Sequence, residues 1–446
     1  MANIIDRLKI KPQRILVLGI GLVMLIGAFL LNLPIASVER ESVGFINALF
    51  TSISATSVTG LVVVNTAQYW SLFGKFVILC LIQIGGLGFM TLTSLIAMIL
   101  GKKIGLRDRL IIQEELNQFN LAGIVRFTKY VIKATFIVEI IGAIILATRF
   151  IPQYGVQTGI VFAIFHAVSA YCNAGFDLLG DSLVKYVGDP LVILTISGLI
   201  VLGGIGYTVY LDITKNRGFK RLTMHTRFAI RITLFLILIG TAFVFISEYD
   251  NPQTLAKLSL DEKFLASVLQ SITTRTAGFN SINLGHINAT TAFCMIILMF
   301  IGGSPSSTAG GIKTTTFGTL VVAVISMIKG KKEVEVLKRT IPTSLVLRAL
   351  AVFLVSAFLV VGVVMVMTIT ENQEFLDIMY EVVSAFSTCG VTRGITSDLT
   401  DTGKIIIMST MYIGKVGPLT LAFAIASRSK NRERKYRYPE GKPLIG

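Results

Sequence analysis

One short pattern occurs four times along the chain, and this repetition limits the possible folds more than any other feature. Each copy is a run of small or hydroxyl-bearing residues that ends in a glycine and an apolar residue. The four glycines are Gly60, Gly175, Gly278 and Gly390. A second marker, a Gly-Gly pair or a variant of it, follows 24 to 28 residues later and begins at Gly85, Gly203, Gly302 and Gly414. Two motifs repeated in register indicate four copies of one structural unit.

The repeats lie in a chain with the composition of a membrane protein. Hydrophobic residues make up 53% of the 446 residues and charged residues only 15%, and the mean hydropathy is +0.75. Several apolar runs reach the roughly 20 residues that a helix needs to cross a bilayer. A stretch of only about ten residues precedes each repeated glycine, which is too short to cross and is typical of a re-entrant helix. Each unit is therefore predicted to contain an outer helix, a half-helix, a glycine loop and an inner helix.

The predicted fold is an all-α polytopic membrane protein. Four parallel repeats of helix, re-entrant pore loop and helix surround one central pore with pseudo-fourfold symmetry. Outer helices are expected at residues 14–33, 125–150, 226–247 and 343–369, and half-helices at 44–53, 158–168, 263–271 and 375–383. Inner helices are expected at 70–100, 188–213, 287–328 and 403–426, of which only the third is broken, by an intramembrane loop. The repeats then span residues 1–110, 111–218, 219–335 and 336–446.

The net charge of +16 is sorted by loop. Lysine and arginine gather near residues 102–129, 215–227 and 329–339 and in the tail after residue 428, whereas the intervening segments are acidic or neutral. By the positive-inside rule, the basic loops and both termini are cytoplasmic, in a multi-pass protein of the cell membrane. The charge therefore indicates contact with the lipid bilayer or a cytosolic partner, and no nucleic acid.

Four re-entrant loops around one axis can place backbone carbonyls where they replace the hydration shell of a cation. Glycine suits such a loop because successive carbonyls face one axis only if some residues adopt left-handed or strained torsions. The half-helices would add the negative ends of their dipoles. The expected filter residues are Val58, Thr59, Gly60, Asn173, Ala174, Gly175, Thr276, Ala277, Gly278, Thr388, Cys389 and Gly390. One glycine in each loop predicts fewer ordered ion sites than a longer filter motif would hold.

A dense block of small and polar residues interrupts the third inner helix. The block consists of Gly302, Gly303, Ser304, Pro305, Ser306, Ser307, Thr308, Ala309, Gly310, Gly311, Ile312 and Lys313. Irregular backbone exposed to hydrocarbon costs several kcal/mol for each unsatisfied group, so it persists only inside protein or against water. The sequence therefore predicts a loop that lines a polar cavity at membrane depth.

Other functions find less support in the sequence. It contains no P-loop, no His-Glu-x-x-His motif, no nucleophile elbow and no metal-ligand cluster, so it indicates neither an enzyme nor a nucleotide site. A secondary cation transporter with a broken-helix site at the membrane midplane is the main alternative, because such transporters also use interrupted helices. They usually show inverted repeats or two halves, and four parallel units favour a channel-like pore.

The motifs that end at the four glycines, with the broken third inner helix, resemble those of the Trk/Ktr/HKT superfamily of potassium transporters over essentially the whole chain. The first helix leads directly to the first loop, without the two additional helices usual in Trk subunits, and Gly60 stands where plant HKT proteins often carry serine. Within the superfamily, the chain resembles the membrane subunit of bacterial Ktr systems (KtrB-like).

The resemblance implies a homodimer with one pore in each subunit. It implies uptake of K⁺ through the carbonyls of the filter residues, with Na⁺ as an activator. It also implies a cytosolic nucleotide-binding ring (KtrA-like) as the partner that controls the pore. In the family, the loop in the third inner helix is a gate beneath the filter, and residues 302–313 match that loop.

Three basic residues are expected at membrane depth. Lys415 replaces the second glycine of the marker in the fourth repeat, near a position where family members place a basic residue facing the pore. It is predicted to raise the barrier for cations, with pairing to a helix carbonyl or a carboxylate such as Glu139 as the alternative. Lys313 either snorkels toward the cytoplasm or holds the gate loop closed. Arg275 is expected to anchor its own re-entrant segment.

Overall fold

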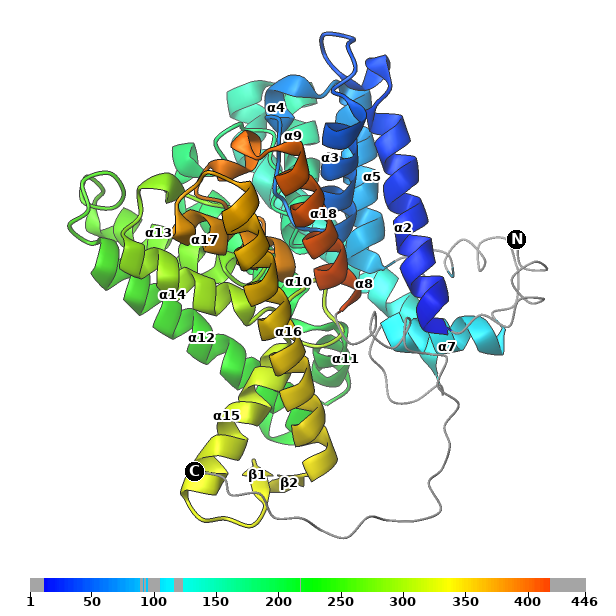
Figure 1. Ribbon diagram of the computed structural model, residues 1–446, viewed down its shortest axis with the longest axis vertical. Helices are drawn as coiled ribbons and strands as arrows, with labels where there is room; N and C mark the ends of the chain where they lie inside the picture. Colours follow the sequence, from blue (N-terminus) through cyan, green and yellow to red (C-terminus); the bar gives the residue numbers. More distant parts are fainter. Residues whose placement is uncertain are drawn as a thin grey trace.

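The computed structural model describes residues 12–88, 91, 94, 105–115, 123–216 and 218–417. Within these ranges the named secondary-structure elements are helices, except for one antiparallel hairpin of β1 (Val334–Val336) and β2 (Arg339–Ile341). The repeats follow one another from the blue α2 (Pro12–Leu31) to the red α18 (Asp401–Val416) in Figure 1. α18 packs against α3 (Phe45–Ser57) of the first repeat, so the fourth repeat lies beside the first. The four repeats are therefore arranged in a ring.

Four outer helices frame the molecule. They are α2, α8 (Ile124–Tyr154), α12 (Met224–Glu248) and α16 (Thr343–Thr370), and in the described part of the chain they are the helices long and apolar enough to cross a membrane individually. Large apolar side chains lie exposed along each of them, among them Phe29, Ile144, Leu238 and Phe358. A helix that exposes such side chains is suited to contact with lipid.

Four shorter helices re-enter toward the centre. They are α3, α9 (Val156–Tyr171), α13 (Leu260–Thr273) and α17 (Phe375–Ser387), and each is 13 to 16 residues long. Each packs against the outer helix of its own repeat. Their C-terminal halves are almost fully buried, whereas the outer helices bury only about a quarter to a third of their length. The re-entrant helices therefore carry the sequence from the surface to the middle of the molecule.

The inner helices differ from expectation in one respect. α5 (Leu72–Leu87), α10 (Pro190–Ile205) and α18 each end at a glycine with a positive φ, namely Gly88, Gly206 and Gly417. After Gly206 the chain turns by 90° into α11 (Tyr207–Lys215). The prediction of an intact second inner helix over 188–213 is therefore wrong. The rest of the inner helices predicted at 70–100 and 403–426, and the basic tail, lie largely outside the described residues.

The third inner helix is interrupted as predicted. α14 (Ala289–Phe300) ends before residues 302–313, and α15 (Thr314–Ile328) begins after them. α15, the hairpin and the adjoining end of α16 extend beyond the helical body at one end of the molecule (Figure 1). The hairpin packs on α12 through Phe228, Val336 and Ile341.

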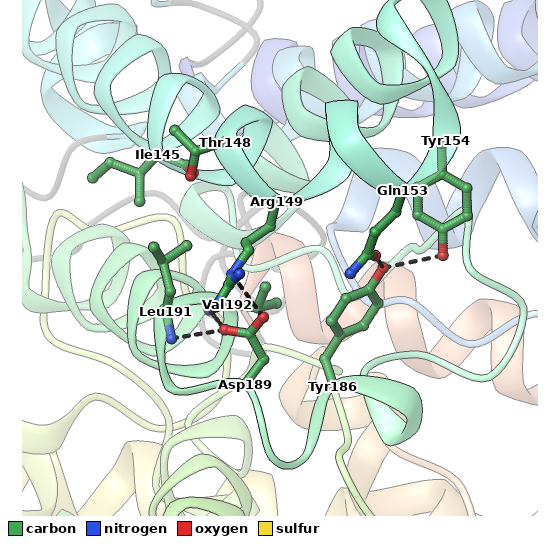
Figure 2. A network of polar contacts seen from close by, with 9 residues as sticks. All are labelled: Ile145, Thr148, Arg149, Gln153, Tyr154, Tyr186, Asp189, Leu191 and Val192. Atoms are coloured by element: carbon green, nitrogen blue, oxygen red, sulfur yellow. Dashed lines mark hydrogen bonds and ion pairs between the residues drawn. The ribbon is translucent and has the colours of Figure 1, made fainter.

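Polar side chains tie the start of each inner helix to the end of its outer helix in repeats 2, 3 and 4. In repeat 2, Asp189 caps α10 through the backbone amides of Leu191 and Val192, and Arg149 of α8 pairs with it at 3.0 Å (Figure 2). In repeats 3 and 4 the carboxylates of Glu248 and Glu371 accept hydrogen bonds at the start of α14 and before α18. These contacts fix the inner helices relative to the outer frame.

Tyr186 extends this network in repeat 2. Its hydroxyl donates to the side-chain oxygen of Gln153 and lies 3.1 Å from the hydroxyl of Tyr154 (Figure 2). Burial, together with the neighbouring Tyr154 hydroxyl and the Asp189 carboxylate, raises the pKa of Tyr186. The phenol therefore stays protonated and keeps donating at any physiological pH.

The remaining short elements are η1 (Pro34–Ala36), α4 (Thr66–Tyr69), α7 (Leu106–Glu115), η2 (Val184–Tyr186), η3 (Phe219–Arg221), η4 (Leu284–His286) and η5 (Ile395–Asp398). They lie between the longer helices, within and between the repeats. The apolar core consists mainly of two clusters. One is built largely by the first two repeats and the other by the last two, with contributions from α3.

Candidate functional site

The loops after the four re-entrant helices share one backbone conformation. In each loop the residue two positions before the glycine is left-handed, with φ of 61° at Val58, 59° at Asn173, 69° at Thr276 and 52° at Thr388. The glycines have φ of 97°, 71°, 85° and 87° in the same order. Left-handed torsions in non-glycine residues cost roughly 1–2 kcal/mol each. Surrounding structure must therefore hold all four loops in this shape.

These loops close into a ring. A Cβ added to Gly60 would lie 2.4 Å from the carbonyl oxygen of Ala174, and one on Gly175 would lie 2.9 Å from that of Ala277. A Cβ on Gly278 would lie 3.1 Å from the oxygen of Cys389, and one on Gly390 only 1.8 Å from that of Thr59. Each glycine thus faces the carbonyl of the residue just before the next repeat's glycine, and the fourth repeat returns to the first. We call residues 58–60, 173–175, 276–278 and 388–390 the glycine ring.

The glycine ring brings together all twelve residues that the sequence suggested for a filter. Their side chains are buried, with at most 1% exposed for the eight that are not glycine. Four main-chain carbonyls and four glycines meet where no side chain fits. The re-entrant helices end directly before the ring, so the negative ends of their dipoles lie beside it. Such an arrangement can coordinate a cation through backbone oxygens.

The Gly-Gly marker packs the inner helices beneath the ring. A Cβ on Gly85 would lie 2.1 Å from the carbonyl oxygen of Thr56, one on Gly203 1.9 Å from that of Tyr171, and one on Gly414 2.0 Å from that of Phe386. Each of these carbonyls stands four residues before the ring glycine of the same repeat. The sequence revealed the near-constant offset between the two motifs, but not that the marker packs the inner helix on the end of its re-entrant helix.

The third repeat departs from this packing. A Cβ on Gly302 would meet the carbonyl oxygen of Gly310 at 2.0 Å, and this oxygen belongs to the interrupting loop itself. The loop thus occupies the place that the end of the re-entrant helix takes in the other three repeats. We call residues 302–313 the intramembrane loop.

The intramembrane loop docks on the second repeat. The Ser304 amide donates to Gly204 O at 2.9 Å and the Thr308 amide to Gly203 O at 3.3 Å. The Tyr207 amide, the first of α11, donates to Ser306 O at 2.7 Å. A Cβ on Gly206 would lie 2.4 Å from Pro305 O. The intramembrane loop therefore packs into the 90° corner between α10 and α11.

The loop also touches the underside of the ring. The Thr308 hydroxyl donates to Tyr171 O at 3.3 Å and lies 3.4 Å from the side-chain amide of Asn173. On the other side, a Cβ on Gly310 would lie 2.1 Å from the hydroxyl oxygen of Thr388. The loop therefore lies against the ring segments of repeats 2 and 4. Most of its residues are buried in protein, as irregular backbone at membrane depth requires.

The basic residues expected at membrane depth lie near the loop and the ring. The Lys313 ammonium donates to Ala309 O at 2.6 Å, which ties the end of the loop to its middle. Lys415, in the last turn of α18, interacts electrostatically with Lys313 and with Cys172, the residue before the second ring segment. The Glu139 carboxylate accepts hydrogen bonds from the Gln83 amide at 3.1 and 3.3 Å.

Arg275 contacts its own repeat, as the sequence predicted. Its guanidinium is buried and donates to the Thr233 hydroxyl of α12 at 3.3 Å. The side chain therefore points to the outer helix of its own repeat, away from the ring.

Comparison with known proteins identifies the family. The model of the TrkH cation transport protein family matches residues 20–435. The chain belongs to this family. The Ktr system potassium uptake protein B of Bacillus subtilis (strain 168) is 46% identical over 444 residues, which cover 100% of this chain and 99% of that protein. The potassium/sodium uptake protein NtpJ of Enterococcus hirae is 41% identical, with 99% and 98% covered.

A solved structure supports the fold independently. The crystal structure of the potassium transporter TrkH from Vibrio parahaemolyticus superposes with a TM-score of 0.72 at 19% sequence identity, and the match covers 92% of this chain and 83% of that one. The chain is thus an integral membrane protein of the TrkH family, with four pore-loop repeats around one centre. The resemblance that the four motifs suggested is confirmed.

Proposed function

We propose that this protein is the membrane-embedded subunit of a potassium uptake system and that K⁺ passes through the glycine ring. The observation that carries the proposal is the closed cycle of four glycines, each facing a main-chain carbonyl of the next repeat. Carbonyl oxygens in such a ring can replace the hydration shell of a cation that has lost its water. Transport of potassium by the relatives in Bacillus and Enterococcus, as their names state, supports K⁺ as the ion.

The intramembrane loop is proposed as the gate. It lies against the ring segments of repeats 2 and 4, which places it on the side where we propose that an ion leaves the ring. The loop is held by hydrogen bonds of 2.7 to 3.3 Å to the second repeat, a set that can be exchanged without unfolding a helix. Lys415 is proposed to face the ion path below the ring and to slow the passage of cations.

The partner and the assembly are part of the proposal. The four repeats correspond to residues 1–110, 111–218, 219–335 and 336–446, with both termini in the cytoplasm. The functional unit is a homodimer that binds a cytosolic nucleotide-binding ring (KtrA-like), which controls the gate, and Na⁺ stimulates uptake. α15 leads from the intramembrane loop to the β1–β2 hairpin at the end of the molecule, where a partner can reach the hairpin (Figure 1).

A growth assay and a flux assay test the proposal together. A bacterial strain that lacks potassium uptake is transformed with the wild-type chain and with Gly278→Ser, both with the cytosolic partner. The wild-type chain should restore growth at low K⁺, and Gly278→Ser should not, because its side chain would enter the ring. Gly362→Ala is the control, since a Cβ at that position would meet nothing within 4 Å.

Purified protein in liposomes then identifies the ion and the mode of transport. Isotope uptake should be faster for K⁺ than for Na⁺ and should follow the K⁺ gradient. In the growth assay, equal restoration of growth by the wild-type chain and by Gly278→Ser would contradict the ring as the ion path. Strict stoichiometric coupling of K⁺ to a second ion would instead favour the secondary cation transporter with a broken-helix site.

A further inference from the structure

Two serines brace the glycine ring from behind. Ser54 stands six residues before Gly60, and Ser384 stands six residues before Gly390. The Gly60 amide donates to the Ser54 hydroxyl at 3.1 Å, and the Gly390 amide donates to the Ser384 hydroxyl at 3.1 Å. Both serines are fully buried. The same contact thus occurs in the first and fourth repeats, which lie side by side in the ring.

Each serine binds two successive amides. The Thr59 amide donates to Ser54 O at 2.8 Å, and the Cys389 amide donates to Ser384 O at 2.8 Å. In a trans peptide unit the N–H and the C=O point in opposite directions. When the N–H of Gly60 is turned back toward the helix end, the carbonyl of Thr59 is turned away from it. Hydroxyl and carbonyl of one serine therefore orient two consecutive peptide units of the ring.

The oriented carbonyls are those that face the neighbouring glycines. Thr59 O is the atom that a Cβ on Gly390 would meet, and Cys389 O is the atom that a Cβ on Gly278 would meet. Without the serine hydroxyl, the glycine N–H would be buried and unpaired, which is unfavourable enough that the peptide unit would rotate toward another acceptor. That rotation would turn a carbonyl out of the ring.

The other two repeats do not repeat this contact. Repeat 2 carries Ser169 at the same offset, but its hydroxyl donates to Phe176 O at 2.7 Å, beyond the ring glycine. Repeat 3 carries Ile272 there, which has no hydroxyl. The ring therefore combines two segments that a serine hydroxyl braces with two segments that are held in other ways.

We propose that Ser54 and Ser384 are positioning residues that hold the Thr59 and Cys389 carbonyls in the ring and thereby set its preference for K⁺ over Na⁺. A ring of fixed radius matches the larger ion, whereas peptide units that can rotate let the oxygens close around the smaller one or leave the site. The inference rests on the proposed passage of K⁺ through the ring.

The test measures the ratio of K⁺ to Na⁺ uptake in liposomes that contain full-length protein. We expect Ser54→Ala and Ser384→Ala each to lower the ratio about threefold, which corresponds to the loss of one hydrogen bond, and the double variant to lower it about tenfold, because the two losses multiply. Ser54→Thr and Ser384→Thr keep the hydroxyl and should restore the ratio toward that of the wild type. Ser169→Ala is the matched control, because it removes a buried serine at the same offset that does not bind the glycine amide, and its ratio should stay within about twofold.

Each outcome decides a different question. Alanine variants that accumulate normally and keep the wild-type ratio would overturn the inference. So would an equal loss of K⁺ and Na⁺ uptake, because it would show that the serines only support folding. If the double variant does not accumulate in the membrane, the two single variants with their threonine counterparts decide. A wild-type protein that does not take up K⁺ would overturn the proposed function itself, whereas K⁺-selective uptake that is indifferent to both serines would overturn only this inference.

Discussion

The four repeats are alike in the layer of the glycine ring and differ in the layer directly below it. In the ring, all four repeats share the same two positive φ positions and the same contact with the next repeat. Below it, the inner helices of three repeats each end at a glycine with a positive φ, whereas the inner helix of the third repeat is interrupted by a loop. Four equal segments suit an ion that must be surrounded on all sides. Unequal segments suit a part that moves relative to a fixed frame.

The first glycine of the Gly-Gly marker shows where the lower layer departs from fourfold symmetry. Gly85, Gly203 and Gly414 each sit on a carbonyl at the end of their own re-entrant helix, at 1.9 to 2.1 Å from an added Cβ. Gly302 keeps the same close approach but makes it to Gly310 of the intramembrane loop. The loop therefore occupies the packing site that the end of the re-entrant helix occupies in the other three repeats. Substitutions at single glycines can therefore disturb the packing of one layer and leave the other unchanged.

The largest effect is expected from Gly390→Ala in the ring. Its Cβ would lie 1.8 Å from Thr59 O, and its φ of 87° is unfavourable for alanine. Forcing atoms into a packed site costs typically about 1–3 kcal/mol, so we expect K⁺ uptake to fall at least about tenfold. Isotope flux in liposomes measures it, after the amount of protein in the membrane has been matched.

Gly394→Ala separates the two causes. Gly394 has φ of 108°, yet a Cβ there would meet nothing within 4 Å. It should therefore show the cost of the torsion without the collision in the ring, and uptake should stay within about threefold of the wild type. An equal loss in both variants would mean that backbone strain, and not the cross-repeat contact, makes the ring sensitive.

Much of the upper layer could be predicted from the sequence because the ring depends on local patterns repeated four times. The half-helices, the glycines and the twelve ring residues follow from offsets along the chain. The corner at Gly206 was not predicted, although glycines with a positive φ also end α5 and α18, and its contact with Pro305 joins residues about 100 positions apart in two repeats. The serine braces were hidden for a different reason. The motif contains several hydroxyl residues, and sequence does not tell which of them binds an amide.

A smaller effect, of opposite sign, is expected from Gly206→Ala in the lower layer. The new Cβ would lie 2.4 Å from Pro305 O and would push the intramembrane loop away from the α10–α11 corner. The hydrogen bond from the Tyr207 amide to Ser306 O would weaken with it. Because the net contribution of one such bond is about 1 kcal/mol, we expect about fivefold higher K⁺ flux in the absence of the cytosolic partner.

Gly218→Ala is the control for this variant. Gly218 has φ of 109° in the loop before α12, and a Cβ there would meet nothing within 4 Å. Its flux without the partner should remain at the wild-type level. If Gly206→Ala also leaves this flux unchanged, or if it lowers it, the loop is not the part that restricts the pore.

The smallest effect is expected from Lys415→Gln, which removes a charge from the lower layer without changing its backbone. Lys415 occupies the position that is glycine in the other three repeats and interacts with the second cation, Lys313. A positive charge below the ring repels a cation that leaves it. Its removal should therefore raise the maximal K⁺ flux about threefold, while Lys415→Arg keeps the charge and should stay near the wild type. Lys404→Gln, at the opposite end of the same helix, where the ammonium binds Asn47 at 3.0 Å, should change the flux less than twofold. A response to Lys404→Gln as large as that to Lys415→Gln would place the charge effect in the helix as a whole and not below the ring.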